Sequence, residues 1–453
     1  MTDSTPASAG IDPAGRPAEE ARPRSRPAAS RVLWSLLAAH AISQTGNVVT
    51  TFAVPFYVLA TGGSGLQIGV AAFFATAPVI IGGPLGGVVV DRIGHRRAAI
   101  TADVVSGVTV LAIPVLALTT GLPFWALLAL VFVGGLLDTP GQTARRVMLP
   151  GFSTAAGVTL ERSVGFLDGS ERFARLVGAP LAGLLVAAAG PLNALFVDAA
   201  SFAVSALITL LLVPRPAARS VASGATASDP ATATDAPSPT RASYWSDLAE
   251  GFRFVSRDPL MRAIVLLVLV TNLFDAARSS SLMPLYAADR LGGAAALGAL
   301  VAVMGGGALV GSILFGFVAH RMPRRLTFSI CFMLAGGPSL AAFAVGLPLP
   351  WLIAATALSG LAAGALNPIL GAVELERVPE HMRARVFGLI NAGAWAGIPF
   401  GALLGGLAAD TIGLTISFAV LAIAYVVVTA VPLRGGTWRL MEKAAISRRV
   451  ASR

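Results

Sequence analysis

Residues 87–97 read G-V-V-V-D-R-I-G-H-R-R and lie between two long apolar runs. The stretch holds one aspartate, three arginines and one histidine, and Gly94 lets the chain turn sharply. Charged side chains are costly inside the hydrocarbon core of a bilayer, so a short charged connection between two apolar helices belongs at a membrane surface. The stretch therefore predicts two membrane-spanning helices joined by a charged loop.

The composition of the whole chain supports a membrane protein. Hydrophobic residues make up 55% of the 453 residues, charged residues only 12%, and the mean hydropathy is +0.76. A soluble domain carries about 25% charged residues. The length accommodates about twelve spans of about 20 residues each. We expect an all-α membrane protein with twelve transmembrane helices. The net charge of +10, nearly all from arginine, fits retention of loops beside anionic lipid rather than nucleic-acid binding.

An internal repeat divides the chain into two halves. Four features recur at one offset of 229 residues (for example 286 − 57): Gly87 with Gly316, Pro55-x-Tyr57 with Pro284-x-Tyr286, Gly69 with Gly298, and Gly135-x-x-Asp138 with Gly364-x-x-Asn367. One constant offset across several helices indicates two parallel six-helix repeats. The expected segments are a disordered tail at 1–31, a first bundle at 32–213, a linker with an amphipathic helix at 214–258, a second bundle at 259–433 and a basic tail at 434–453.

The charged loop resembles the signature loop of the major facilitator superfamily, Gly-x-x-x-Asp-Arg-x-Gly-Arg-Arg/Lys. The matching residues are Gly87, Asp91, Arg92, Gly94, Arg96 and Arg97, and only His95 departs from the pattern. In the second copy Arg321 and Arg325 remain, while His320 replaces the Asp and Pro323 the Gly. The resemblance implies alternating access between two bundles. It also implies a gating loop, in which Asp91 faces the start of the eleventh span when the cavity opens outward.

Polar side chains inside the expected spans are candidates for substrate or proton binding, because such groups must face protein or a water-filled cavity. They are Gln44, Asn47, Asp198, Asn272, Asp275 and Arg278. Asp198 has no basic residue within a turn, so it is the preferred proton carrier provided that it faces the cavity. Asp275 has Arg278 three residues on and is expected to form an ion pair. Plain hydrogen bonds between helices remain the alternative for these polar residues.

Two segments rich in glycine and proline suggest hinges in the fifth and eleventh spans. They contain Gly178, Pro180 and Gly183 in the first half and Gly397, Pro399 and Gly401 in the second. The first resembles the helix-5 motif of exporters in the superfamily, although Ala179 stands where that motif has glycine. A face of small residues for helix packing is the alternative. Residues 251–255, G-F-R-F-V, also resemble the branch that contains macrolide and siderophore exporters.

The sequence argues against ATP-driven transport and against catalysis. The sole lysine is Lys443, so no phosphate-binding loop of the Walker type is present, and no His or Cys pair has metal-ligand spacing. We expect no catalytic residue, cofactor or metal site. The predicted function is proton-coupled export of an amphipathic small molecule by a monomer in the cell membrane, in contact with lipid and with both termini cytoplasmic. Uptake of a small metabolite and a transporter-like membrane sensor are the alternatives.

Overall fold

The computed structural model describes residues 26–214 and 241–442, and within these residues every regular element is a helix. The first half contains six long helices: α1 (Arg26–Ala60), α2 (Gly65–Ile93), α3 (His95–Thr119), α4 (Phe124–Ala156), α5 (Leu160–Ala189) and α6 (Pro191–Leu212). A separate helix, α7 (Arg241–Arg257), precedes the second half. The second half contains α8 (Pro259–Ala276), α9 (Met283–Arg290), α10 (Ala294–Val318), α11 (Arg324–Val345), α12 (Leu349–Ala363), α13 (Leu366–Arg377), α14 (Arg383–Trp395), α15 (Ile398–Ile412) and α16 (Leu414–Ala430).

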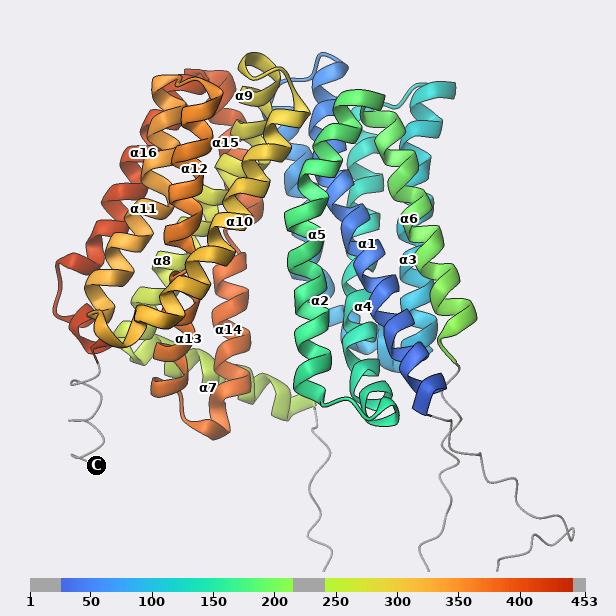
Figure 1. Ribbon diagram of the computed structural model, residues 1–453, viewed down its shortest axis with the longest axis horizontal. Coiled ribbons are helices and arrows are strands. Elements are labelled where there is room, and N and C mark those ends of the chain that lie inside the picture. Colours follow the sequence, from blue (N-terminus) through green and yellow to red (C-terminus); the bar gives the residue numbers. More distant parts are fainter. Residues whose placement is uncertain (1–25, 215–240, 443–453) are drawn as a thin grey trace, which may run out of the picture.

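The helices form two bundles that stand side by side (Figure 1). The long helices of both bundles, α1–α6 and α8–α16, run roughly parallel or antiparallel to one another (Figure 1). We call the end where α1 begins and α7 lies the terminal end, and the opposite end the distal end. α7 packs on α14 and α8, so it belongs with the second bundle (Figure 1). The arrangement confirms the predicted all-α membrane fold.

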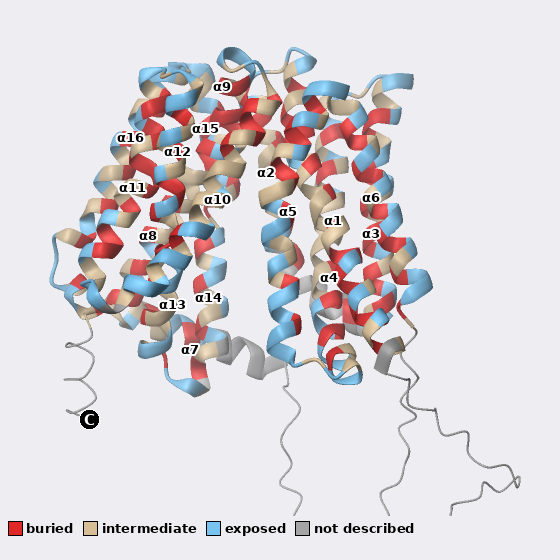
Figure 2. Ribbon diagram, viewed as in Figure 1, coloured by how far each residue is buried: buried red, intermediate tan, exposed pale blue. Residues whose placement is uncertain are grey.

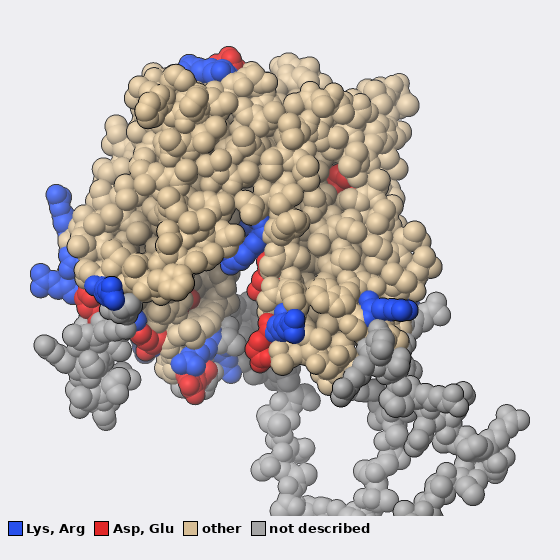
Figure 3. Space-filling model, viewed as in Figure 1, with Lys and Arg blue, Asp and Glu red and all other residues tan. Residues whose placement is uncertain are grey.

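The surface of the molecule suits a lipid bilayer. Within the described residues, ten helical segments are long and apolar enough to cross a membrane. α1 and α2 complete the first bundle but are not among these ten. That they also cross the membrane, which would give twelve spans in all, stays a prediction. Large apolar side chains are exposed on the outer helices, such as Leu211 at 69% and Phe317 at 74%. Charged side chains gather toward the two ends, and the broad middle band is almost free of them (Figure 3).

Three of the expected spans of the second half are interrupted. The seventh continues from α8 into a π-helical segment, Ala277–Leu282, before α9. The tenth is divided between α12 and α13, and the eleventh between α14 and α15. The sequence predicted continuous helices here. Glycine at the breaks, Gly364 and Gly397, lets neighbouring backbones approach closely, which explains the local irregularity.

Several expected boundaries shift in the structure. α4 continues to Ala156 and contains both Pro140 and Pro150. α1 begins at Arg26, inside the expected tail, and residues 1–25, 215–240 and 443–453 lie outside the described residues. The start of the expected basic tail is packed: Trp438 is 5% exposed, and its ring stacks on Phe328 at 6.0 Å. Burial of an aromatic ring is favourable enough to hold this segment on the bundle.

The two bundles meet at the distal end along two seams rich in glycine. In one seam α2 crosses α15, and a Cβ atom on Gly69 would lie 2.6 Å from the Ala402 carbonyl oxygen. In the other seam α5 crosses α10, and a Cβ atom on Gly298 would lie 2.7 Å from the Ala179 carbonyl oxygen. The repeated pair Gly69 and Gly298 thus serves equivalent seams. Only glycine permits backbones to come this close.

The bundles separate toward the terminal end. Figure 3 shows the molecule hollowed between the two halves at this end. Figure 2 shows buried residues where the halves meet at the distal end, while the lower part of α5 is largely exposed. The structure is therefore closed at the distal end and open at the terminal end.

Candidate functional site

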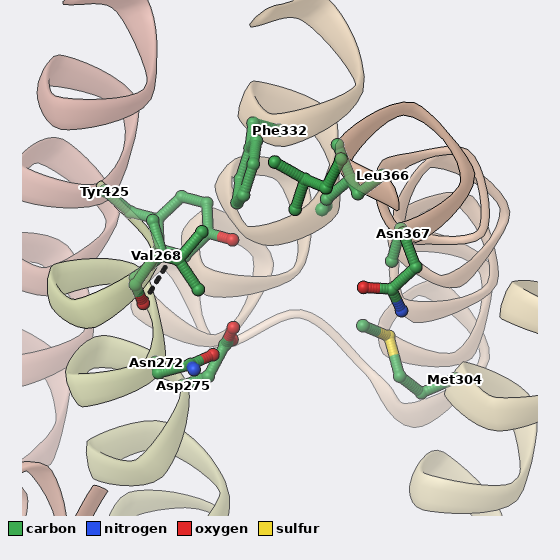
Figure 4. Close-up of a pocket in the computed structure, with 12 residues that line it drawn as sticks. Val268, Asn272, Asp275, Met304, Phe332, Leu366, Asn367 and Tyr425 are labelled. Atoms are coloured by element: carbon green, nitrogen blue, oxygen red, sulfur yellow. Dashed lines mark hydrogen bonds between the residues drawn. The ribbon is translucent and has the colours of Figure 1, made fainter. Parts of the chain in front are cut away.

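A polar cavity of about 160 Å³ lies in the second bundle, between α8, α10, α11, α13 and α16. Its polar lining comes from Thr271, Asn272, Asp275, Asn367 and Tyr425, and its apolar lining includes Met304 and Phe332. Figure 4 shows Asn272 and Asp275 on α8 facing Asn367 and Met304 across the space. This mixture of a few polar groups on an apolar wall is typical of small-molecule sites.

Asp275 and Arg278 form the ion pair that the sequence suggested. Arg278 Nη2 lies 3.2 Å from Asp275 Oδ1, and the exposed fraction is 40% for the aspartate side chain and 9% for the arginine side chain. Arg278 Nη1 also donates to Ser339 Oγ at 3.3 Å. Arg278 is the second residue of the π-helical segment, a distortion that occurs frequently at functional sites. The carboxylate therefore faces the cavity while its partner is held in the protein.

Asn272 connects the cavity to the break in the eleventh span. Its Nδ2 atom donates to the carbonyl oxygen of Ala394 at 2.8 Å. Because α14 ends at Trp395 and α15 begins at Ile398, carbonyl groups near the break lack their usual helical partners. The amide of Asn272 satisfies one of them and ties α8 to α14.

The first bundle holds a second polar group on α1 and α4. Asn47 Nδ2 donates to Gln44 Oε1 at 3.2 Å and to Asp138 Oδ2 at 3.2 Å. Gln142 Nε2 donates to the same Asp138 oxygen at 2.7 Å. Asp138 is the repeat equivalent of Asn367, which lines the cavity of the second bundle. The sequence singled out Gln44 and Asn47 but not Asp138, although the repeated Gly-x-x-Asp/Asn spacing was a usable signal.

Asp198 lies within the first bundle, at the contact of α6 with α1. Its side chain is fully buried. It accepts hydrogen bonds from Thr50 on α1 and, at 3.2 Å, from Ser201 on its own helix. A Cβ atom on Gly46 would lie 2.1 Å from Asp198 Oδ1, so α1 passes directly over the carboxylate. The structure therefore places Asp198 in the interhelical hydrogen bonding that was the alternative for this residue.

A buried network near the terminal end was missing from the sequence-based candidates. Arg145 on α4 pairs with Asp103 on α3, and their side chains are 1% and 2% exposed. Ser205 on α6 donates to Asp103 Oδ2 at 2.7 Å and accepts from Arg145 Nη2 at 3.1 Å. Asp103 and Arg145 are 42 residues apart in the chain. Three-dimensional contact alone brings them together.

Charged residues also line α5 beside this network. Arg146 Nη2 lies 2.8 Å from Glu171 Oε1 and 3.3 Å from Asp168 Oδ1. His40 is fully buried on α1, and its Nε2 atom lies 3.3 Å from the same Glu171 oxygen. These contacts hold α1, α4 and α5 together in the terminal half of the first bundle.

The arginines of the two charged loops bind the ends of their own bundles. Arg96 donates to the carbonyl oxygens of Leu210 and Val213, both at 2.6 Å, at the end of α6. Arg325, its equivalent at the 229-residue offset (325 − 96), donates to the carbonyl oxygen of Pro432 at 2.8 Å after α16. A cation at a helix C-terminus satisfies free carbonyl groups and suits the helix dipole.

The remaining members of the gating loop lie around these two arginines. Gly87 and Asp91 lie in the last turns of α2, and the structure describes no side chain for either. Gly94 has φ +85°, the conformation expected for the turn. Arg92, Arg97 and Arg321 are exposed at the terminal end. The gating role therefore stays a prediction.

The glycine and proline residues of the suggested hinges differ in their surroundings. A Cβ atom on Gly183 would lie 2.5 Å from the Ala294 carbonyl oxygen, in the seam between the bundles. Gly401 meets the Leu273 carbonyl oxygen within its own bundle, and Gly397 meets that of Leu269. Gly178 has only ordinary contacts with Val48 and Thr45. Pro180 lies inside α5, and Pro399 is near the start of α15.

The chain is similar in sequence to two efflux proteins and in structure to a solved transporter. The chain is 30% identical to the multidrug efflux pump Tap of Mycolicibacterium fortuitum, over 86% of this chain and 91% of that protein. It is 23% identical to macrolide efflux protein A of Streptococcus pyogenes, over 84% and 90%. Among solved structures, the nucleoside transporter NupG has a TM-score of 0.64 at 15% identity, covering 89% and 98%.

The family profile described as Major Facilitator Superfamily matches residues 36–306 and 265–439. These matches span both bundles and the charged loop on which the sequence resemblance rests. Members of this family are membrane transporters and not enzymes. The chain belongs to the major facilitator superfamily.

Proposed function

We propose that this chain exports drug-like, amphipathic small molecules across the cell membrane by alternating access, coupled to proton entry. The relatives named as a multidrug efflux pump and a macrolide efflux protein align over most of their length with this chain, which supports export of this substrate class. We further propose that it works as a monomer with its outer helices in contact with lipid.

The substrate site is proposed to lie between the bundles. The cavity of the second bundle, at about 160 Å³, is smaller than the roughly 300–1,000 Å³ of a typical small-molecule site. A complete site therefore needs a second wall. We assign that wall to Gln44, Asn47 and Asp138 of the first bundle, because Asp138 is the repeat equivalent of the cavity residue Asn367.

Both termini are proposed to be cytoplasmic. The loops at 92–97, 141–163, 321–325 and 374–385 hold three arginines each, while the opposite turns hold only Arg290. Excess positive charge marks cytoplasmic loops. In this orientation the hollow opens toward the cytoplasm, where an exporter loads its substrate.

The orientation can be tested with single cysteines at Ser64 and Ser228 after replacement of Cys331. An impermeant thiol reagent added to whole cells should label position 64 and not position 228. Labelling at position 228 instead would reverse the proposed topology.

Proton coupling is proposed to use Asp275. The sequence preferred Asp198 only if it faced the cavity, and its carboxylate lies between α1 and α6 instead. Asp275 lines the cavity and is paired with Arg278. Protonation of Asp275 would end this ion pair and change the charge that the cavity presents to a substrate. This ion pair, with its aspartate facing the cavity and its arginine nearly buried, is the observation that carries the proposed mechanism.

The function can be tested by drug accumulation in a host that lacks its own efflux pumps. Expression of the wild-type protein should lower accumulation of some members of a panel of antibiotics and siderophores. Asp275→Asn should abolish that effect, whereas Asp289→Asn, which changes an exposed carboxylate at the distal end, should not. Increased accumulation on expression would indicate an uptake permease, and no change for any compound would refute export of this class.

A further inference from the structure

The distal seam between α2 and α15 contains a hydrogen-bonded contact between a carboxylate of one bundle and the backbone of the other. Asp410, in the last turn of α15, accepts hydrogen bonds from two backbone N–H groups in the first turn of α2. Gly65 N lies 2.8 Å from Asp410 Oδ1, and Leu66 N lies 2.8 Å from Asp410 Oδ2. Each oxygen of the carboxylate thus serves one donor of the opposite bundle.

These two bonds complete the cap of α2. The Ser64 hydroxyl accepts from Gln67 N at 3.3 Å, and the Gln67 side chain accepts from Ser64 N at 3.0 Å. This capping box leaves the N–H groups of Gly65 and Leu66 without a partner from their own helix, as is usual at a helix start. Asp410 supplies both missing acceptors. The cap of α2 is therefore complete only while the bundles touch at the distal end.

The position of Asp410 in its own helix is unfavourable. A carboxylate in the last turn of a helix meets the negative end of the helix dipole, whereas one beside a helix start meets the positive end. Asp410 lies two residues before the end of α15 at Ile412 and directly before the start of α2. The electrostatic benefit of this carboxylate thus comes from the opposite bundle.

The backbones of α2 and α15 pass close together beside Asp410, which is itself an exposed residue. A Cβ atom on Gly65 would lie 2.7 Å from Asp410 Oδ1 and 2.9 Å from the Gly406 carbonyl oxygen. The same Cβ atom would lie 3.1 Å from the Leu285 side chain. The close approach at Gly65 brings the start of α2 within hydrogen-bond distance of the Asp410 carboxylate.

We propose that Asp410 is a latch that stabilises the distal-closed state by capping α2 from the other bundle. When the distal end opens, Gly65 and Leu66 exchange the carboxylate for water, and this stabilisation is lost. Asp410 is a positioning residue for alternating access: it has no contact with the cavity lining described above. The proposal rests on the alternating access proposed above, in which the two bundles move apart at the distal end. It does not depend on which substrate is transported.

The latch can be tested by the rate at which a cysteine in the seam reacts. The reporter is Leu285→Cys in a Cys331→Ser background, purified in detergent and treated with a maleimide. Leu285 is half-buried in the distal-closed state, so a larger fraction of molecules open at the distal end should raise this rate. Asp410→Ala should increase the reaction rate by up to about fivefold. A helix cap usually contributes about 1 kcal/mol, and losing that free energy changes an equilibrium by about this factor. Asp410→Asn keeps one acceptor oxygen and should give a smaller increase.

Ser64→Ala is the matched control, because it removes a cap of the same helix end from within the same bundle. It should lower thermal stability without a comparable increase in the reaction rate. An unchanged rate in both Asp410 variants would overturn the latch, and so would an equal increase in Ser64→Ala, which would indicate fraying of α2. The assay needs no substrate, so its outcome is independent of whether the protein exports drugs.

Discussion

Gly406→Ala should prevent the distal end from closing fully. A Cβ atom at this position would lie 2.1 Å from the carbonyl oxygen of Gly65 and 3.1 Å from the Cα atom of Gly69. Close carbon–oxygen contacts begin at about 3.3 Å, so the two helices would have to separate by about 1 Å. The three nearest atoms all belong to α2, so the clash is expected only in the distal-closed state.

The expected shift follows from the cost of overpacking. An additional methyl group in a tightly packed contact costs about 1–3 kcal/mol. Since this cost falls on one of two states, the ratio of distal-open to distal-closed molecules should rise about 5-fold to 150-fold. Transport should fall, because the cycle must pass through both states.

Spin labels on the distal surface can measure this shift. Thr120 follows α3 in the first bundle, and Val345 ends α11 in the second; both are exposed. With cysteines at these positions and Cys331 replaced, the pairwise distance distribution should gain a longer component in Gly406→Ala.

Two other glycines of the second bundle provide controls, Gly405 on α15 and Gly371 on α13. Gly405→Ala places its Cβ atom 2.7 Å from the carbonyl oxygen of Ala277, which belongs to the same bundle, so it should reduce stability without lengthening the distance. Gly371→Ala meets nothing within 4 Å and should change neither. A distance distribution in Gly406→Ala identical to that of the wild type would refute the reasoning.

Three further predictions concern charged residues. Arg145→Met should lower the free energy of unfolding by about 3–5 kcal/mol, because it leaves the Asp103 carboxylate buried without its partner. The double variant with Asp103→Leu should recover part of this loss in a chemical denaturation experiment, and no recovery would contradict the pairing. Asp91→Asn should retain expression and membrane insertion but strongly reduce drug export, and full export would remove its gating role. In inverted vesicles, Asp275→Asn should lose drug-induced proton release, whereas Asp198→Asn should retain it; the reverse result would return coupling to Asp198.

The sequence alone determined the class of fold and its division into two repeats. The charged loop at 87–97 and the low fraction of charged residues predicted a helical membrane protein, because a bilayer excludes unpaired charge and unsatisfied backbone groups. The 229-residue offset also identified equivalent positions in the two halves of the chain. Gly69 and Gly298 proved to occupy equivalent seams, and Arg96 and Arg325 bind equivalent helix ends.

Only the tertiary structure decided what each intramembrane polar residue does. Asp198 and Asp275 are both carboxylates within apolar spans, yet one is enclosed between α1 and α6 and the other faces a cavity. Arg145 and Asp103 are far apart in the chain and form one buried pair. Asp410 contacts a helix that lies 345 residues earlier. Helical periodicity fixes which residues share a face, but the rotation of each helix and the choice of its neighbours depend on how all the helices pack together.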